Sequence, residues 1–231
     1  QCPVGTSVIV RNLFYNVPAR RKFLKSDQVE MRHILDEFHH LALAFENIQF
    51  KLYHNEQEIY SLPAGSLRNR IINIFGKKIN EHLVPVEEET NYVNFAGYIG
   101  KPKLGKKSRG EQFLFVNRRF IRSSYLQHAV KSAYEDILPA DQYPFYVLFL
   151  DINADKIDVN VHPTKQEIKF EDERIIYNYL RVACRHALGK YSITPSLDFE
   201  QEVGINRPTG DAPARTSFNQ VASENDIPAI R

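Results

Sequence analysis

The stretch Asp158-Val159-Asn160-Val161-His162-Pro163-Thr164-Lys165 is the most informative part of this chain of 231 residues. Two valines alternate in it with polar residues, and an apolar residue, Ile157, precedes it at the same spacing. Because successive side chains of a strand point to opposite faces, this period of two predicts a half-exposed strand with one polar face. The fold class around it is therefore expected to contain sheet.

A lysine follows this predicted strand directly. Pro163 restricts the local backbone, so the ammonium group of Lys165 can be aimed at one point, where it could act as a point charge on a terminal phosphate. Spacing alone favours the alternative of a solvated lysine. The polar face of the strand lacks a third nitrogen or sulfur ligand for zinc and further carboxylates for a hard cation, so no metal site is predicted.

The segments outside this stretch predict a mixed α+β fold. A helix should begin at Asp27, where Glu30 completes a capping box, and another at Ser124, where Gln127 does the same. The first of these helices should bury one apolar stripe: Ile34, Leu35, Phe38, Leu41, Ala42 and Phe45. Further helices are predicted over 67–75 and 172–188, and strands near 8–15, 50–52, 59–60, 83–86, 93–99, 112–116 and 145–150.

Basic residues gather in one part of the chain. Between residues 101 and 122 eight of them stand against one acid, Glu111. They are Lys101, Lys103, Lys106, Lys107, Arg109, Arg118, Arg119 and Arg122. Aromatic residues are interleaved with these cations, as is typical of surfaces that bind nucleic acid without reading its sequence. A well-solvated surface is the alternative interpretation.

A second group of cations, Arg20, Arg21 and Lys22, follows the predicted strand end at Asn16-Val17-Pro18. Guanidinium groups match phosphate oxygens in a bidentate fork, so a nucleotide or a nucleic-acid backbone would be a natural ligand. Ion pairs with a neighbouring segment are an equally good explanation of this group.

Composition excludes several classes of protein. No apolar run is long enough to span a membrane, no signal segment is present at the start, and the two cysteines are far apart, which fits a reduced, cytoplasmic setting. The chain begins at Gln1 rather than methionine, so a fragment is expected. From residue 193 onward Pro, Asn, Ser and Asp accumulate, which predicts a disordered linker over 193–231.

Three motifs together resemble the MutL family of DNA mismatch-repair proteins. Gly5-Thr6, a strand and Leu13-Phe14-Tyr15-Asn16-Val17-Pro18-Ala19-Arg20-Arg21-Lys22-Phe23-Leu24 resemble the segment that ends its ATP-binding domain. Phe115-Val116-Asn117-Arg118-Arg119 resembles a strand of its second domain, although Arg118 stands where the family commonly has glycine. The stretch from Asp158 to Lys165, with Glu167 and Phe170, resembles a third box.

The resemblance implies a fold, a cofactor and site residues. The fold would be α+β: the C-terminal part of a gyrase, chaperone, histidine-kinase and MutL (GHKL) ATPase domain over 1–63, a ribosomal-protein-like transducer domain over 66–192, and the linker. The cofactor would be ATP with Mg²⁺, with Gly5 and Thr6 near the adenine and Lys165 at the γ-phosphate. DNA would be faced by Arg119 and, with it, Arg118, Lys106, Lys107 and Arg109.

The resemblance also implies partners, while the missing motifs limit activity. We expect DNA, a MutS-type mismatch sensor, a downstream nuclease or helicase, and a second copy or a MutL-type paralogue, but no membrane; bacterial members would associate with the nucleoid. The family's catalytic Glu, Mg²⁺-binding Asn and adenine motif are absent from these residues, so this fragment alone should not hydrolyse ATP. A type II topoisomerase transducer and an RNA-binding module with a ribosomal-protein-like fold are the rival interpretations.

Overall fold

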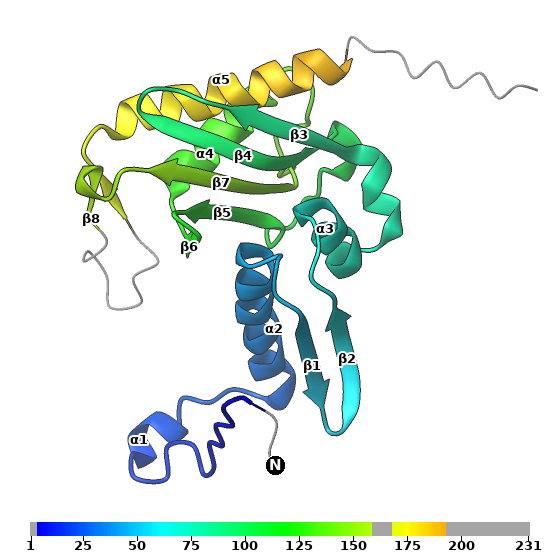
Figure 1. Cartoon of the computed structure of the whole chain (residues 1–231), viewed down its shortest axis with the longest axis vertical. Helices are drawn as coiled ribbons and strands as arrows, with labels where there is room; N and C mark the ends of the chain where they lie inside the picture. The colour runs from blue at the N-terminus through cyan, green and yellow to red at the C-terminus, as the bar shows by residue number, and fades with distance from the viewer. Residues whose placement is uncertain (1–3, 159–167, 193–231) are drawn as a thin grey trace, which may run out of the picture. The chain divides into compact units, whose positions relative to one another are not determined.

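The computed structural model describes residues 4–158 and 168–192 (Figure 1). Helices and strands are mixed along this part of the chain, which confirms the predicted α+β class. In chain order the described elements are α1 (Pro18–Arg21), α2 (Asp27–Ala44), β1 (Phe50–His54), β2 (Gln57–Leu62), α3 (Leu67–Phe75), η1 (Lys77–His82), β3 (Leu83–Glu88), β4 (Val93–Gly100), η2 (Pro102–Leu104), β5 (Gln112–Val116), β6 (Arg119–Ile121), α4 (Ser124–Ala133), β7 (Tyr146–Ile152), η3 (Ala154–Lys156), β8 (Ile157–Asp158), β9 (Lys169–Phe170) and α5 (Glu173–Ser192).

A five-stranded sheet forms the centre of the described structure, in the order β3-β4-β7-β5-β6 (Figure 1). Strands β5 and β7 run parallel, with Phe113 opposite Val147, and the other neighbouring pairs are antiparallel. Parallel strands cannot be joined by a tight turn, and here the connection passes through β6 and helix α4. Strand β6 is short and lies at the edge of the sheet, next to the parallel pair.

Alternate residues of the sheet enter two different hydrophobic clusters. On β5, Leu114 and Val116 belong to a cluster with α4 and α5, whereas Phe113 and Phe115 belong to a cluster with α3 and the last residues of α2. A sheet with both faces covered has apolar residues at successive positions, as the uninterrupted apolar run of β5 predicts. The basic turn after β5 is thus held by a strand that is buried on both sides.

Most helix ends lie close to the predicted positions, although the N-cap of α2 is Ser26 rather than Asp27 and forms no side-chain capping hydrogen bond. Helix α3 ends before Gly76, as predicted, and the φ of +96° at this glycine lies in the region that other residues avoid. Helix α4 is capped by Ser123, whose hydroxyl oxygen accepts a hydrogen bond from the amide of Leu126 at 3.2 Å, so the predicted cap is wrong by one residue. Helix α5 continues through Gly189, where the sequence predicted its end.

Helix α2 buries less of its apolar stripe than the sequence predicts. Ala42 is buried as expected, but Ile34 and Leu41 are 52% and 53% exposed. The cause is position along the helix, because only the C-terminal end meets the sheet, and it buries Leu43 and Ala44 there. Along its side the helix contacts the hairpin of β1 and β2, the two strands that the sequence predicts near 50–52 and 59–60. The contact is made through the rings of Phe38, His39, Phe50 and Tyr60.

Residues 4–26 depart furthest from prediction. The expected strand over 8–15 is not a strand in the structure, and short helix α1 follows it. Val8 and Val10 are 80% and 73% exposed, and no described segment pairs with them. A strand exists only when its backbone groups find a neighbouring strand, which local sequence does not supply. The hydrogen bonds of this segment join residues close in the chain.

Two predicted features fall outside the described residues. These are Lys165 with the residues around it, and the linker over 193–231. The described part of the predicted strand that precedes Lys165 is β8, which pairs with β9 through Ile157 and Phe170. All described residues lie in one compact unit, and the division at 63–66 stays a prediction.

Candidate nucleic-acid interface

The turn between β5 and β6 determines the directions of two neighbouring arginine side chains, Arg118 and Arg119. Asn117 and Arg118 both have positive φ, of 48° and 65°, in the left-handed region that suits a two-residue hairpin. The side chain of Asn117 donates to the carbonyl of Ile152 at 2.9 Å and accepts from the amide of the same residue at 3.0 Å. This pair of hydrogen bonds fixes the turn against the end of β7, and the arginines leave the turn in defined directions.

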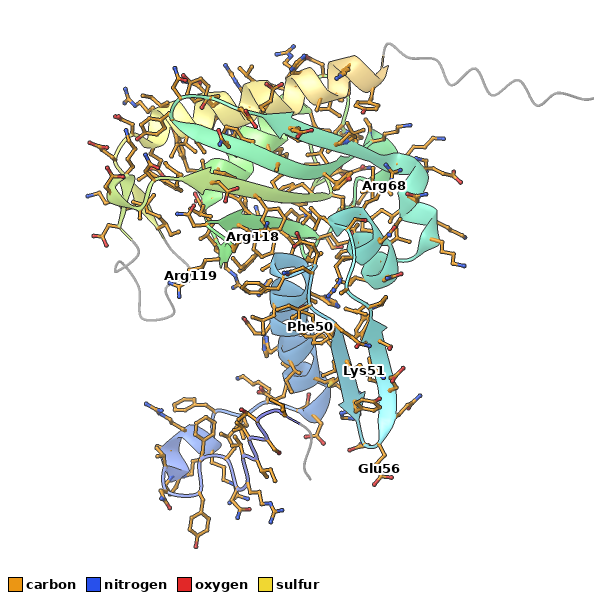
Figure 2. The ribbon with its side chains drawn as sticks, in the orientation of Figure 1. Phe50, Lys51, Glu56, Arg68, Arg118 and Arg119 are labelled. Atoms are coloured by element: carbon orange, nitrogen blue, oxygen red, sulfur yellow. The ribbon has the colours of Figure 1, made fainter. Side chains whose placement is uncertain are left out.

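Arg118 is directed toward the C-terminal end of helix α2 (Figure 2). Its Nη1 donates to the carbonyl of Ala44 at 3.2 Å and forms an ion pair with Glu46 at 2.9 Å. Its guanidinium carbon lies 5.1 Å from the ring centroid of Phe149. A cation at this helix end also interacts favourably with the helix dipole. About half of the side chain remains exposed, so the guanidinium holds α2 while one side of it faces solvent.

Arg119 has none of the contacts that hold Arg118 against helix α2. It is exposed on the edge strand β6, and it forms no ion pair with any of the described residues. Figure 2 shows its side chain pointing away from the body of the sheet. A guanidinium without an internal partner keeps all its donors available for an external anion, and phosphate oxygens match its forked geometry.

Two lysines of the basic loop between β4 and β5 have acid partners. Lys106 pairs with Glu111 at 2.6 Å, and Lys107 with Asp141 at 3.0 Å. The guanidinium carbon of Arg109 lies 4.8 Å from the ring centroid of Tyr143, and Arg109 has no ion pair among the described residues. Both lysine pairs are at the surface, where an ion pair contributes little to the free energy of folding. Sequence counting alone therefore overstated the free positive charge of this loop.

Sequence reasoning missed a buried arginine at the same helix end. Arg70 of α3 is 1% exposed, and its guanidinium donates to four backbone carbonyls while lying 5.4 Å from the ring centroid of Phe50. The acceptors are Ala42 at 3.1 Å, Glu46 at 3.0 Å, Ile48 at 2.6 Å and Pro63 at 3.1 Å. Burial lowers the pKa of Arg70, an effect that the charge of Glu46 opposes. Nothing in the local sequence distinguishes Arg70 from a surface arginine.

Two histidines of α2 lie beside these groups. The ring of His40 stacks on Phe120 with centroids 3.5 Å apart, and that of His39 has Nε2 3.1 Å from the hydroxyl of Tyr60. Burial lowers the pKa of both, against the raising effects of Glu37 on His40 and of Asp36 on His39. Burial therefore favours the neutral form of both imidazoles. Within the described ranges, no three His, Cys, Asp or Glu residues lie together as a metal site would require.

Comparison with known proteins gives the family. The family model described as "DNA mismatch repair protein, C-terminal domain" matches residues 71–189. The chain belongs to the MutL family of DNA mismatch repair proteins. The MutL of Flavobacterium psychrophilum is 53% identical over 206 residues, which are 89% of this chain and 34% of that protein. The MutL of Bacteroides fragilis is 42% identical over 223 residues, 94% of this chain and 36% of that protein. This MutL-family chain thus spans about a third of the length of the curated relatives that it matches.

Solved structures agree with the fold of a MutL-family chain. The N-terminal domain of a DNA repair protein superposes with a TM-score of 0.65 at 24% identity, over 78% of this chain and 60% of that one. A mutated MutL ATPase domain from Aquifex aeolicus gives a TM-score of 0.52 at 21% identity, with the same two coverages. No helix in the described part of the chain is long and apolar enough to cross a membrane.

Of the residues that the MutL resemblance assigns to nucleotide, the structure describes Gly5 and Thr6. Gly5 has no atom within 4 Å of where a Cβ would stand, and Thr6 is exposed. Arg20 and Arg21 of α1 are exposed as well and form no ion pair among the described residues. Lys165 lies outside those residues. The described site is therefore the cationic surface around β6.

Proposed function

We propose that this chain is the DNA-facing part of an ATP-driven mismatch repair protein. The observation that carries the proposal is Arg119, an exposed guanidinium without an acid partner among the described residues, held on an edge strand in a mismatch-repair family chain. DNA carries a regular array of phosphates, and each one that is neutralised releases roughly 0.9 counterion on a duplex. Arg119 would contribute most to DNA binding, and Arg109 would be a further contact. Arg118, Lys106 and Lys107 would contribute less to DNA binding because they already have acid partners.

We infer that ATP controls this surface in the whole protein. Residues 1–63 would complete an ATPase domain and 66–192 would form the transducer, with 193–231 as a linker to further parts. The exposed apolar residues of the segment 4–26 and of α2 support the assignment of residues 1–63 to a larger domain. Contact with the rest of that domain would remove these side chains from water. Gly5 and Thr6 would line the nucleotide, with Mg²⁺ on its phosphates, and Lys165 would contact the γ-phosphate only in the triphosphate state.

The proposed cellular role is that of a clamp and matchmaker. A coupling of about 1–3 kcal/mol between nucleotide and domain angle is sufficient to bias a closed dimer, formed with a second copy or a MutL-type paralogue. In that state the protein would pass the signal from a MutS-type sensor to a downstream nuclease or helicase. The location would be the cytoplasm, at the nucleoid. The relatives described as "DNA mismatch repair protein MutL" support the part of this role that lies in mismatch repair.

The DNA proposal is tested with two neighbouring arginines. Arg119→Gln and Arg118→Gln remove the same charge from adjacent positions, but only Arg118 has an internal acid partner. We expect Arg119→Gln to weaken binding to duplexes of mixed sequence about equally and to lower the salt slope by about one. Arg118→Gln should have the smaller effect. Fluorescence anisotropy over a salt series measures both. Unchanged binding by Arg119→Gln, or an effect limited to one base sequence, contradicts the proposal.

The ATP proposal requires the full-length protein. There we expect Lys165→Ala to lower ATP turnover and ATP affinity, whereas Lys169→Ala, a change of an exposed lysine on nearby β9, should leave both unchanged. A coupled assay gives turnover, and equilibrium binding of a non-hydrolysable analogue gives affinity. Equal turnover and affinity in Lys165→Ala and the parent protein would remove Lys165 from the nucleotide site.

A further inference from the structure

A pocket lies between helix α2 and the cationic strands of the second half of the chain. Its walls come from four places: α2, the end of the basic loop with β5, strand β6 with the residue that follows it, and α4. The lining residues that matter for the argument are Asp36, His40, Arg109, Phe120, Arg122 and Gln127. No residue of this group except Arg109 was singled out by the sequence as a ligand contact.

One wall of the pocket is an aromatic stack. The imidazole of His40 lies parallel to the Phe120 ring, at 3.5 Å between centroids and 13° between planes. The guanidinium carbon of Arg122 is 5.9 Å from the centroid of the same ring. Arg122 also acts on His40 through its charge, since it lowers the pKa of that imidazole. A charged group that directly follows β6 and a titratable group from α2 therefore meet at one pocket.

The two arginines of the pocket have no acid partner in the part of the chain that the structure describes. Neither Arg109 nor Arg122 forms an ion pair among the described residues, although Lys106 and Lys107 of the same basic stretch both do. Asp36 lines the pocket as well, yet its carboxylate is not paired with either guanidinium. Two unpaired cations on one pocket repel each other, and an anion between them removes that repulsion.

The remaining polar groups narrow the choice of anion. The side chain of Gln112 is already used, since it donates to the carbonyl of Pro144 and accepts from the amide of Gly110. The Gln127 amide has no such partner among the described residues, so it is a further donor. Two guanidinium forks and an amide offer many N–H donors to a compact group with several oxygens, which is the chemistry of phosphate.

We propose that this pocket binds one phosphate of the DNA backbone, with Arg109 and Arg122 as its charged ligands, His40 in contact and Gln127 as a neutral donor. The proposal rests on the proposed DNA function and extends it. The bound phosphate contacts α2 and β6 at the same time, so DNA ties the helix to the sheet edge. A free phosphate ion is the other source of the same chemistry.

Binding at this pocket is linked to protons. A phosphate beside His40 favours the imidazolium form, as Glu37 does, whereas burial and Arg122 oppose it, with Asp36, His39 and Arg109 as the other charged or titratable neighbours. DNA affinity is therefore expected to rise as the pH falls from about 8 to about 6. In His40→Gln this additional pH dependence disappears. A role of His40 in packing alone would not change the pH profile of DNA binding.

The test compares two double variants that remove equal charge from one region of the chain. Arg109→Gln with Arg122→Gln removes the unpaired cations, and Lys106→Gln with Lys107→Gln removes two cations that already have acid partners. We expect the arginine pair to weaken DNA binding by about ten- to hundredfold and to reduce the salt slope by about 0.9 or more. The lysine pair should have the smaller effect. Circular dichroism confirms that each variant is folded.

Each other outcome has a defined meaning. Equal losses in the two double variants indicate a general charge effect and overturn the pocket. No loss in the arginine pair, while Arg119→Gln does weaken binding, overturns the pocket and leaves the proposed function intact. No loss in any variant, Arg119→Gln included, removes the proposed function as well. Titration with inorganic phosphate in a calorimeter separates the two sources: binding of the free ion that depends on Arg109 and Arg122, without any change in DNA affinity, overturns the assignment to DNA.

Discussion

The two ends of helix α2 have opposite surroundings. At its C-terminal end Leu43 and Ala44 are buried against the sheet, and the guanidinium groups of Arg70 and Arg118 donate hydrogen bonds to the carbonyls of Ala42 and Ala44. Toward its N-terminal end Ile34 is half exposed, and the preceding segment 4–26 makes only local backbone hydrogen bonds. A helix of 18 residues is thus held in place by the contacts of its last turns.

The largest expected effect is at Arg70. Arg70→Met keeps the length and apolar stem of the side chain but leaves four carbonyls without their donor. We expect the free energy of unfolding to fall by about 3–5 kcal/mol, as for other buried charged groups that lose one partner. Urea denaturation followed by circular dichroism measures it. The matched control is Arg68→Met on the same helix, whose guanidinium contacts Asn80 alone and should cost about 1 kcal/mol. Equal losses would mean that the helix end is not anchored by Arg70.

The second effect is at Arg118, where the contribution of the ion pair to stability can be measured separately from that of the left-handed backbone. Glu46→Gln breaks the ion pair without changing the turn, and should cost about 0.2–1 kcal/mol because the pair is partly exposed. Arg118→Ala and Arg118→Gly both remove the cation, but glycine relieves the φ of +65°. The glycine variant should therefore be about 1 kcal/mol more stable than the alanine variant by urea denaturation. The reverse order would show that the turn is not strained.

The third effect concerns pH and the histidines that flank the anchored end. The pKa values of His39 and His40 are lower in the folded chain than the ordinary 6.5, so protons bind more tightly to the unfolded chain. The stability that these groups provide is present above about pH 6.5 and is lost as the pH falls below it. We expect the melting temperature to fall between pH 7.5 and 5.5, and to fall less in His40→Gln. His33→Gln, an exposed histidine of the same helix, should follow the parent chain.

The smallest effect is expected in the segment before α2. Ile9→Ser and Phe23→Ser change residues that are 71% and 76% exposed. The free energy of unfolding of this chain should therefore change by no more than about 0.5 kcal/mol in either variant. Leu43→Ala, at the buried C-terminal end of α2, should lower the free energy of unfolding by about 2–5 kcal/mol. The same urea titration serves for all three. A large loss in Phe23→Ser would show that the segment packs against the rest of the chain.

The elements that could be predicted from sequence are those whose signal is local. The apolar run of β5, the glycine that ends α3 and the polar turn between β1 and β2 all stand in the structure where the sequence predicts them. The strand over 8–15 was wrong because a strand depends on a neighbour that local pattern does not specify. The stripe of α2 was partly wrong for a similar reason, since periodicity identifies an apolar face but not what covers it.

The candidate site divides in the same way. The sequence identified Arg119 and Arg109 as cations of a basic region, and these stay proposals as contacts to DNA. It could not show that Arg118 reaches Glu46, because 71 residues lie between them in the chain. Arg70 had no distinguishing pattern, and Arg122 was only one cation of the basic region, because pairing and burial depend on which segments meet in three dimensions. Charge counting finds a basic region, whereas only geometry separates paired cations from unpaired ones.

The position of β7 in the sheet has a consequence for how the chain folds during synthesis. Strand β7 is the last of the five sheet strands to be made, yet it lies between β4 and β5 and pairs with both. Until Ile152 has left the ribosome, the five-stranded sheet can exist only as its separate β3–β4 and β5–β6 hairpins, and isolated hairpins are marginally stable in water. The sheet therefore closes in one late, long-range step, and chains truncated before β7 should remain exposed to proteases and aggregation.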